Sequence, residues 1–259
     1  MPQQERGVEV RVTDDLEALS REAAADVARR TEEAARHDRV SVALSGGTTP
    51  RRLYELLASE PYRTRVPWAR LHVFLVDERC VPPDHPDSNF RMIHATLLSR
   101  VAVPAAHLHP IPVDHGDPPS VASAYEHTLR TFFQSDGEGG SSFDVVVLGL
   151  GEDGHTASLF PGSPAISEAT RWVTSTIGGI PRLPRITLTI PALTRAKHLV
   201  WVVAGTRKAS VLREVLEGAN QGRELPARQV RPRQGTSLWC VDRDASARLD
   251  RTLRIGRAR

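Results

Sequence analysis

The stretch FDVVVLGLGEDGHTASLFPG, residues 143–162, decides the fold of this 259-residue chain. Its first part is a short apolar run rich in valine, and its second part is a glycine-rich, acidic turn that contains a histidine. A continuous apolar run of this kind is typical of a strand covered on both faces. The abrupt change of composition predicts that this strand ends in a loop at the carboxyl edge of a sheet, where open α/β sheets bind their ligands.

Strand and helix patterns alternate on both sides of this stretch. We predict strands at residues 8–12, 40–44, 71–76, 143–150, 185–190, 198–204 and 237–241, and helices at residues 15–37, 51–59, 89–100, 119–133 and 206–217. Such alternation predicts a Rossmann-like α/β fold, with an open, mostly parallel sheet and helices on both faces. With no internal repeat and no long linker, we expect a single domain over residues 1–259, with its core at about 8–241 and a basic tail at 243–259.

Composition excludes several classes of protein. Lys and Arg number 34 and Asp and Glu 31, so the net charge is only +3, and aromatic residues make up 5%. We therefore expect no nucleic-acid partner, because single-strand binding needs aromatic platforms and a basic groove. Neither an apolar run of about 20 residues nor the apolar core of a secretory signal is present, so we expect no membrane span. Two cysteines without metal or disulfide spacing favour a cytoplasmic location.

The loop after the second strand, Ser45-Gly46-Gly47-Thr48-Thr49-Pro50, has the composition of an anion site. Consecutive glycines allow a sharp turn that exposes N–H groups, and a helix start favours a phosphate. We expect Thr49 to cap the following helix and Pro50 to be its first residue. A plain strand-to-helix turn explains the same residues equally well.

Two acids and an arginine, Asp77-Glu78-Arg79, follow the third strand in a polar loop over residues 77–89. Charges at the end of a buried strand require partners. They indicate either general acid/base catalysis by the carboxylates, with Arg79 binding an anionic group, or a salt bridge that holds the loop in place.

The loop after the central strand carries Asp153-Gly154-His155. It matches the dinucleotide pattern G-x-G-x-x-G, but Pro161-Gly162 ends the helix that this pattern requires. An imidazole titrates near neutrality, so His155 is suited to remove a proton from water, unless it is a structural histidine. Arg185 and Lys208 are further candidates for a phosphate, or ordinary surface cations. No metal site is expected at the remaining histidines, because nothing fixes a ligand set at His107, His109 or His115.

In order and spacing these motifs resemble the lactonases of the glucosamine-6-phosphate isomerase/6-phosphogluconolactonase family. The resemblance runs from about residue 8 to residue 241 and rests on the loops at 45–50, 77–79 with 88–89, 149–162, 185–189 and 205–208. It implies hydrolysis of 6-phospho-D-glucono-1,5-lactone to 6-phospho-D-gluconate in the oxidative pentose phosphate pathway. It further implies a phosphorylated sugar lactone as the partner, no cofactor, no metal and a monomer.

Under this reading His155 is the general base, with Asp153 or Asp77 orienting it. The phosphate is expected at Ser45, Gly46, Gly47, Thr48 and Lys208, with Arg79 or Arg185 as further contacts. Which of Asp77, Glu78 and Asp153 touches His155 stays open. Glucosamine-6-phosphate deaminase is the alternative, but its loop carries a glutamate where this chain has Phe160. A non-catalytic sugar-phosphate sensor is a second alternative, although such sensors usually carry a DNA-binding domain for which this chain has no spare length.

Overall fold

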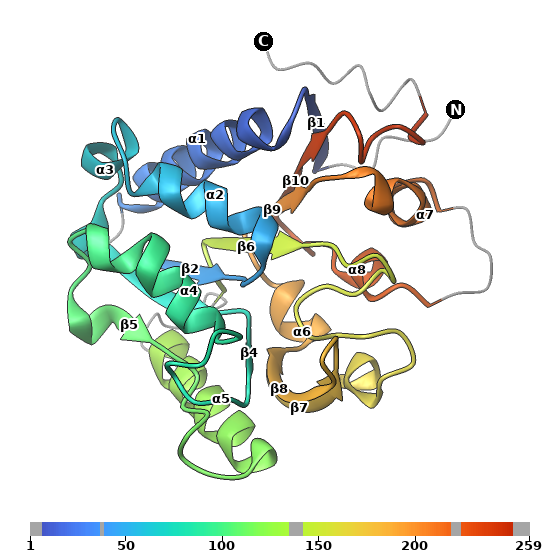
Figure 1. Cartoon of the computed structure of the whole chain (residues 1–259). Coiled ribbons are helices and arrows are strands. Elements are labelled where there is room, and N and C mark those ends of the chain that lie inside the picture. The colour runs from blue at the N-terminus through green and yellow to red at the C-terminus, as the bar shows by residue number, and fades with distance from the viewer. Residues whose placement is uncertain (1–6, 37–38, 135–141, 219–223, 251–259) are drawn as a thin grey trace.

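A seven-stranded sheet forms the centre of the structure, a computed structural model that describes residues 7–36, 39–134, 142–218 and 224–250 (Figure 1). All its paired neighbours run parallel. In sheet order the strands are β1 (Val8–Thr13), β10 (Thr236–Asp242), β9 (His198–Val203), β6 (Val145–Gly149), β2 (Val40–Leu44), β3 (Leu71–Leu75) and β5 (Leu108–His109). The prediction of a mostly parallel sheet around the valine-rich strand is thus confirmed.

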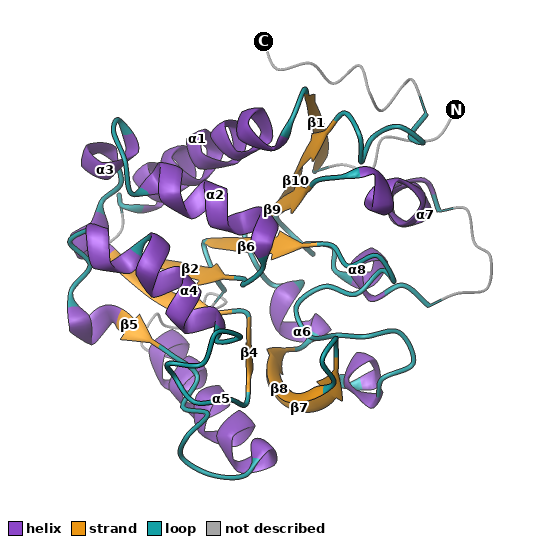
Figure 2. Cartoon of the chain, in the orientation of Figure 1, coloured by secondary structure: helices purple, strands orange, loops and turns teal. Residues whose placement is uncertain are grey.

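Helices cover both sides of this sheet, as predicted (Figure 2). In the view of Figure 1, α1 and α2 lie above the strands, and α5 and α6 lie below them. The longer helices are α1 (Leu16–Ala34), α2 (Thr48–Leu57), α4 (Asn89–Thr96), α5 (Pro118–Gln134) and α7 (Ala209–Glu217), and the short ones are α3 (Tyr62–Arg65), α6 (Ile190–Leu193) and α8 (Pro226–Gln229).

A second, three-stranded antiparallel sheet was not predicted. Its order is β4 (Asp77–Arg79), β8 (Leu183–Leu188) and β7 (Val173–Gly178). The prediction of a loop over 77–89 is therefore wrong at its start, and the strand predicted at 185–190 belongs to this small sheet. A three-residue polar strand carries no hydrophobic period, so the sequence gives no signal for it. Its pairing places Arg79 opposite Arg185.

The start of α2 also differs from the prediction. The helix begins at Thr48, and Gly47, not Thr49, occupies the capping position. Gly47 has φ 105°, a backbone conformation that favours glycine. No side chain caps this helix start. Its first N–H groups therefore remain available to a ligand. The surface loop predicted at 135–142 lies almost wholly outside the described residues.

Two histidines are held in surroundings that disfavour their charge. His72 on β3 stacks on His107 with ring centroids 3.9 Å apart, and its Nδ1 lies 3.1 Å from His109 Nε2. Burial, reinforced by the charges of these two rings and of Arg39, lowers the pKa of His72 to about 4.

Burial and the nearby Arg30 likewise lower the pKa of His198 on β9 to about 4, against the opposing charges of Asp26 and Glu33.

We expect the free energy of unfolding to fall in mild acid. A histidine of the unfolded chain titrates near 6.5, so between that pH and about 4 the unfolded state binds more protons. The contribution of the two neutral histidines to the free energy of unfolding is complete above about pH 6.5 and is lost as the pH falls toward 4. Because both rings are partly exposed, we expect about 1 kcal/mol from each between about pH 7 and pH 5. Urea unfolding of His72→Phe, which keeps a stacked ring without a titrating group, should show a weaker pH dependence. An unchanged dependence would contradict the assignment.

Candidate active site

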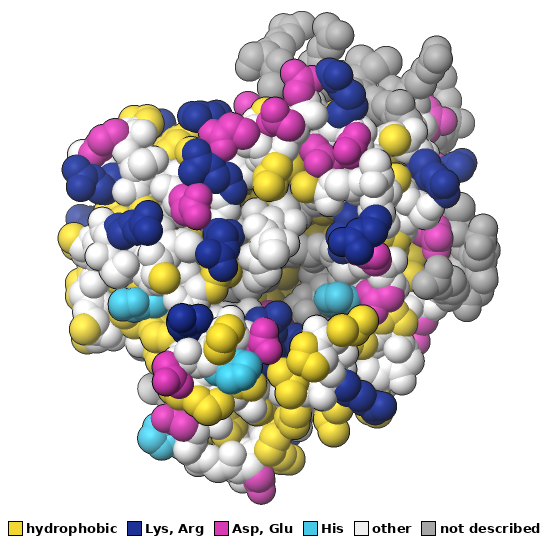
Figure 3. All heavy atoms as spheres, viewed as in Figure 1, with side chains coloured by type: hydrophobic (Ala, Val, Ile, Leu, Met, Phe, Trp, Pro, Cys, Tyr) yellow, Lys and Arg dark blue, Asp and Glu magenta, His cyan; other side chains and the backbone are white. Residues whose placement is uncertain are grey.

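A cavity of about 450 Å³ opens at the carboxyl ends of β2, β6 and β9. Figure 3 shows it as a hollow near the middle of this face, with Lys or Arg and a histidine at its rim. Its walls come from the loops after these strands and from β4, α4 and β8. The lining residues are Ser45, Gly46, Gly47, Thr48, Thr49, Pro50, Asp77, Arg79, Asn89, Gly149, Leu150, Gly151, Glu152, His155, Thr156, Ala157, Arg185, Ala204, Gly205, Thr206, Arg207 and Lys208.

His155 forms a pair with Asp153 at the edge of the cavity. Its Nδ1 lies 2.6 Å from Asp153 Oδ1, and its backbone N–H donates to the same oxygen at 3.1 Å. Burial alone would raise the pKa of Asp153, but hydrogen bonding and the charge of His155 outweigh it and bring the pKa to about 2. With Nδ1 engaged, Nε2 is the imidazole nitrogen left for a ligand.

The loop makes room for this pair at Gly151. A Cβ atom there would lie 2.0 Å from His155 Nδ1 and 2.6 Å from Asp153 Oδ1, closer than atoms can approach. The loop is closed by a hydrogen bond from Gly151 N to His155 O at 2.8 Å. Glycine at 151 is therefore a condition for the observed position of the imidazole.

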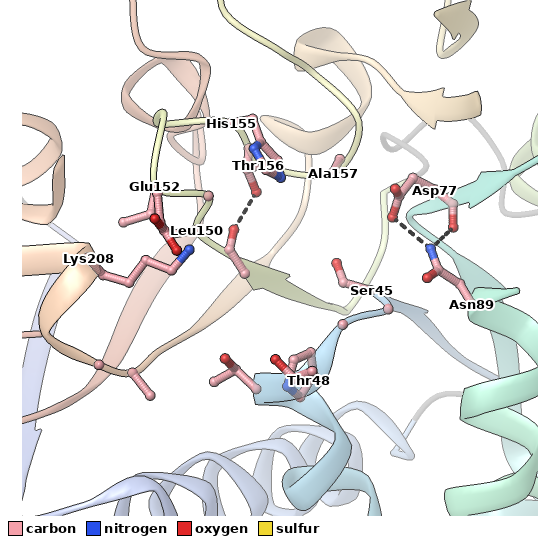
Figure 4. Close-up of a pocket in the computed structure, with 18 of the residues that line it drawn as sticks. Ser45, Thr48, Asp77, Asn89, Leu150, Glu152, His155, Thr156, Ala157 and Lys208 are labelled. Atoms are coloured by element: carbon pink, nitrogen blue, oxygen red, sulfur yellow. Dashed lines mark hydrogen bonds between the residues drawn. The ribbon is translucent and has the colours of Figure 1, made fainter. Parts of the chain in front are cut away.

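Asp77 also lines the cavity, but its contacts are to other residues. Asp77 Oδ2 accepts a hydrogen bond from Ser158 Oγ at 2.5 Å. Asn89 Nδ2 donates to the backbone oxygen of Asp77 at 2.8 Å and lies 3.3 Å from Asp77 Oδ1. Figure 4 shows Asp77 and Asn89 on one side of the cavity. Asp153, rather than Asp77, is thus the carboxylate in contact with the imidazole.

Glu78 does not line the cavity and instead anchors the start of α4. Its carboxylate accepts from the backbone N–H groups of Arg79, Asn89 and Phe90 and from the hydroxyl of Ser88. Burial raises the pKa of Glu78 in spite of these bonds. Among Asp77, Glu78 and Asp153, the three carboxylates considered from the sequence, Glu78 is therefore the one with a structural role.

Two arginines line the cavity together with Asp77. Arg79 Nη1 donates to the backbone oxygen of Asp87 at 2.6 Å and to Asn89 Oδ1 at 2.7 Å. Arg185 is only 7% exposed, and its Nε donates to the oxygen of Gly178 at 2.9 Å. Burial, together with the charge of Arg79, lowers the pKa of Arg185, against the attraction of Asp77.

A second group of cations and N–H groups lies on the other side of the cavity. The uncapped start of α2 contributes Gly47 and Thr48, and Lys208 is the last residue of the short 3-10 turn Thr206–Lys208. Lys208 is half-buried, which lowers its pKa, and Glu152 attracts its charge. Figure 4 shows Lys208 and Glu152 opposite Asp77, with His155 and Thr48 between the two sides.

Ser45 and Gly46 also have structural roles that the sequence did not indicate. Ser45 Oγ donates to the oxygen of Val147 at 2.7 Å and so ties β2 to β6. A Cβ at Gly46 would lie 1.7 Å from Asn89 Oδ1, so this glycine makes room for Asn89. The structure thus brings every predicted site residue to the cavity wall except Asp153, which contacts His155 but does not line the cavity. Sequence reasoning assigned no role to Asn89, Glu152 or Ser158.

The described residues contain no cluster of three or more histidine, cysteine or acidic side chains arranged to hold a metal ion. Within the same residues, no helix is both long and apolar enough to cross a membrane. His107 and His109 lie against His72, and His115 lies 3.4 Å from Asp114 on the surface.

Fold and cavity together define a class: an open parallel α/β protein with a histidine–aspartate pair and an anion-attracting helix start at the carboxyl edge of its sheet. Within that class the chain belongs to the family of glucosamine-6-phosphate isomerases and 6-phosphogluconolactonases, whose family model matches residues 14–239.

Individual relatives agree with this family. The chain is 43% identical over 221 residues to a 6-phosphogluconolactonase of Synechocystis sp., covering 85% of this chain and 89% of that protein. The crystal structure of 6-phosphogluconolactonase from Thermotoga maritima superimposes with a TM-score of 0.77 at 31% identity, over 91% of this chain and all of that one. A monomeric glucosamine-6-phosphate deaminase has the same TM-score of 0.77 at 19% identity, over 93% and 99% of the two chains. At that identity the likeness shows the fold alone.

Proposed function

We infer that this chain hydrolyses 6-phospho-D-glucono-1,5-lactone to 6-phospho-D-gluconate, the second step of the oxidative pentose phosphate pathway. The observation that carries this inference is the His155–Asp153 pair at 2.6 Å, set in a cavity with cationic groups on two sides. The lactonase names of relatives that match most of the chain support the same reaction.

In the reaction that we propose, His155 Nε2 accepts a proton from a water molecule as the water oxygen bonds to the lactone carbonyl carbon. The Asp153 carboxylate fixes the orientation of the imidazole through its contact with Nδ1. The negative charge that develops on the carbonyl oxygen of the lactone is stabilised by hydrogen-bond donors of the cavity wall. The bond from the carbonyl carbon to the ring oxygen then breaks, and the imidazolium returns its proton to that oxygen, so no covalent intermediate on the chain is required.

The two charged sides of the cavity suggest how the substrate lies. The charge of Lys208 interacts with Glu152, Arg207 and Asp153, whereas that of Arg185 interacts with Asp77, Arg79 and Glu78. A phosphate on the exocyclic carbon and a carbonyl on the ring are well separated within one substrate. We assign the phosphate to Lys208 and the start of α2, with Gly46, Gly47 and Thr48. We assign the carbonyl oxygen to the side with Arg79 and Arg185.

Lys208→Met is expected to raise KM for the lactone by about tenfold to a hundredfold, because a charged hydrogen bond to a phosphate contributes about 1.5–3 kcal/mol. The effect on kcat should be within a few-fold, since the phosphate is remote from the reacting carbon. Initial rates over a range of lactone concentrations test this. Arg213→Met is a matched control, because Arg213 on α7 is exposed and pairs with Glu217. An unchanged KM in Lys208→Met would remove Lys208 from the phosphate site.

The proposed activity is tested by following proton release, or coupled 6-phosphogluconate formation, from freshly generated lactone against an enzyme-free blank. Glucosamine 6-phosphate is tested in parallel for ammonia release. Turnover of the lactone without ammonia is the expected result. Ammonia release would favour the deaminase, and tight binding of 6-phosphogluconate without turnover would favour a sensor.

We further propose that the chain acts as a monomer in the cytoplasm. The resemblance to the family's lactonases supports the monomer, and two cysteines without disulfide or metal spacing support the cytoplasm. Light scattering coupled to size exclusion gives the molar mass that tests the monomer.

A further inference from the structure

Phe160 contacts two side chains of the candidate active site, His155 and Arg185. Its ring centroid is 4.8 Å from that of His155, with the planes inclined at 46°. The guanidinium carbon of Arg185 lies 5.5 Å from the same ring centroid. Phe160 is not among the residues that line the cavity, so it does not reach a substrate held there.

The turn between β7 and β8 is shaped around this ring and this guanidinium. A Cβ at Gly178 would lie 2.4 Å from Phe160 Cδ2, and one at Gly179 would lie 2.1 Å from Arg185 Nη2. Gly179 also has φ 83°, in the region that favours glycine. Because Gly178 O accepts the bond from Arg185 Nε, the turn, the arginine and the phenylalanine form one packed unit.

The hydrogen bonds alone leave both polar groups incompletely fixed. His155 is held at one ring nitrogen by Asp153, and in the described part of the chain Arg185 has one side-chain hydrogen bond, from Nε. A single bond permits a planar group to tilt about it. An aromatic ring against each planar group restricts that tilt, and a guanidinium near an aromatic ring is also attracted to it.

We propose that Phe160 is a positioning residue for lactone hydrolysis, whose ring holds the His155 imidazole and the Arg185 guanidinium in the orientations that face the substrate. This inference rests on the proposed function. It links the group assigned as the base and a group assigned to the carbonyl side through one side chain. A misplacement of about 1 Å in either can lower the rate by about a hundredfold.

Two independent changes disturb this packing. Phe160→Leu removes the ring, and Gly178→Ala forces the ring to move while Phe160 itself is kept. For each we expect kcat to fall by about tenfold to a hundredfold, with KM and the affinity for 6-phosphogluconate changed by less than about threefold. Phe90→Leu is the matched control, because Phe90 on α4 is also partly buried and its ring lies 6.0 Å from that of His94. This control should keep full activity.

A double-mutant cycle shows whether Phe160 acts through His155. In Asp153→Asn the imidazole has already lost its anchoring carboxylate, so adding Phe160→Leu should lower kcat by less than it does in the unchanged chain. Equal effects in both backgrounds, or unchanged kcat in Phe160→Leu and Gly178→Ala, would overturn the proposal. A loss of kcat and of 6-phosphogluconate affinity in the same proportion would also overturn it, because that would indicate general damage to the site.

A spectroscopic readout separates this proposal from the proposed function. The ring protons of His155 should shift in the NMR spectrum of Phe160→Leu, since an aromatic ring 4.8 Å away contributes a ring current. The shift should not occur in Phe90→Leu. If the unchanged chain did not hydrolyse the lactone, the proposed function would fail, and an unshifted His155 resonance would independently refute the placement of Phe160.

Discussion

His155→Asn is expected to lower kcat for lactone hydrolysis by about a hundredfold to ten-thousandfold, the usual contribution of a general base. The asparagine amide can still donate to Asp153, but it cannot accept a proton from water. Affinity for 6-phosphogluconate should stay within a few-fold, because the groups assigned to the phosphate are unchanged. Steady-state rates and calorimetric titration of 6-phosphogluconate measure the two quantities separately.

The control for this experiment is His127→Asn. His127 is an exposed histidine on α5 and is absent from the cavity wall, so its replacement should leave both rate and affinity unchanged. If His155→Asn weakened binding as strongly as it lowered kcat, His155 would be a binding residue rather than the base.

Gly151→Ala is expected to lower kcat/KM by roughly a hundredfold, which is the loss expected when a catalytic base is misplaced. The added methyl group would lie 2.0 Å from His155 Nδ1 and 2.6 Å from Asp153 Oδ1, so the pair must separate or the loop must move. Thr128→Ala is the control, because Thr128 is exposed on α5 and is absent from the cavity wall. An unchanged kcat/KM in Gly151→Ala, or an equal loss in Thr128→Ala, would show that the close contact does not control activity.

Strong local signals explain which parts of the fold could be predicted. The strands β2 and β6 and the helix α1 follow from apolar runs and helical spacing. The cavity could be located because glycine-rich and acidic loops follow the strands of a parallel sheet, whose carboxyl ends lie along one edge. These inferences need only local sequence and general topology.

The rest of the site depends on contacts between distant segments, which periodicity does not encode. The small antiparallel sheet pairs Asp77 with Thr187, far apart in the sequence. Ser158 and Phe160 have ordinary polar and apolar side chains, and their roles follow from the side chains they touch, whereas Asn89 also lines the cavity. The choice between Asp77, Glu78 and Asp153 as the neighbour of His155 was likewise left open by the sequence, since all three follow strands that end at the same edge.

The β7–β8 hairpin supplies Arg185 to the cavity from outside the seven-stranded sheet. It is fastened to α5 through Glu126, which accepts from Arg171 Nε at 3.1 Å and from Trp172 N at 2.9 Å. The proposed base and phosphate groups, in contrast, follow strands of the main sheet. The architecture therefore assembles the proposed active site from two separately anchored parts of the fold. Because Gly178 and Arg185 of the hairpin pack on Phe160, sequence change in residues 173–188 can alter the rate as well as the choice of lactone, so an exchange of this hairpin between relatives must include residue 160.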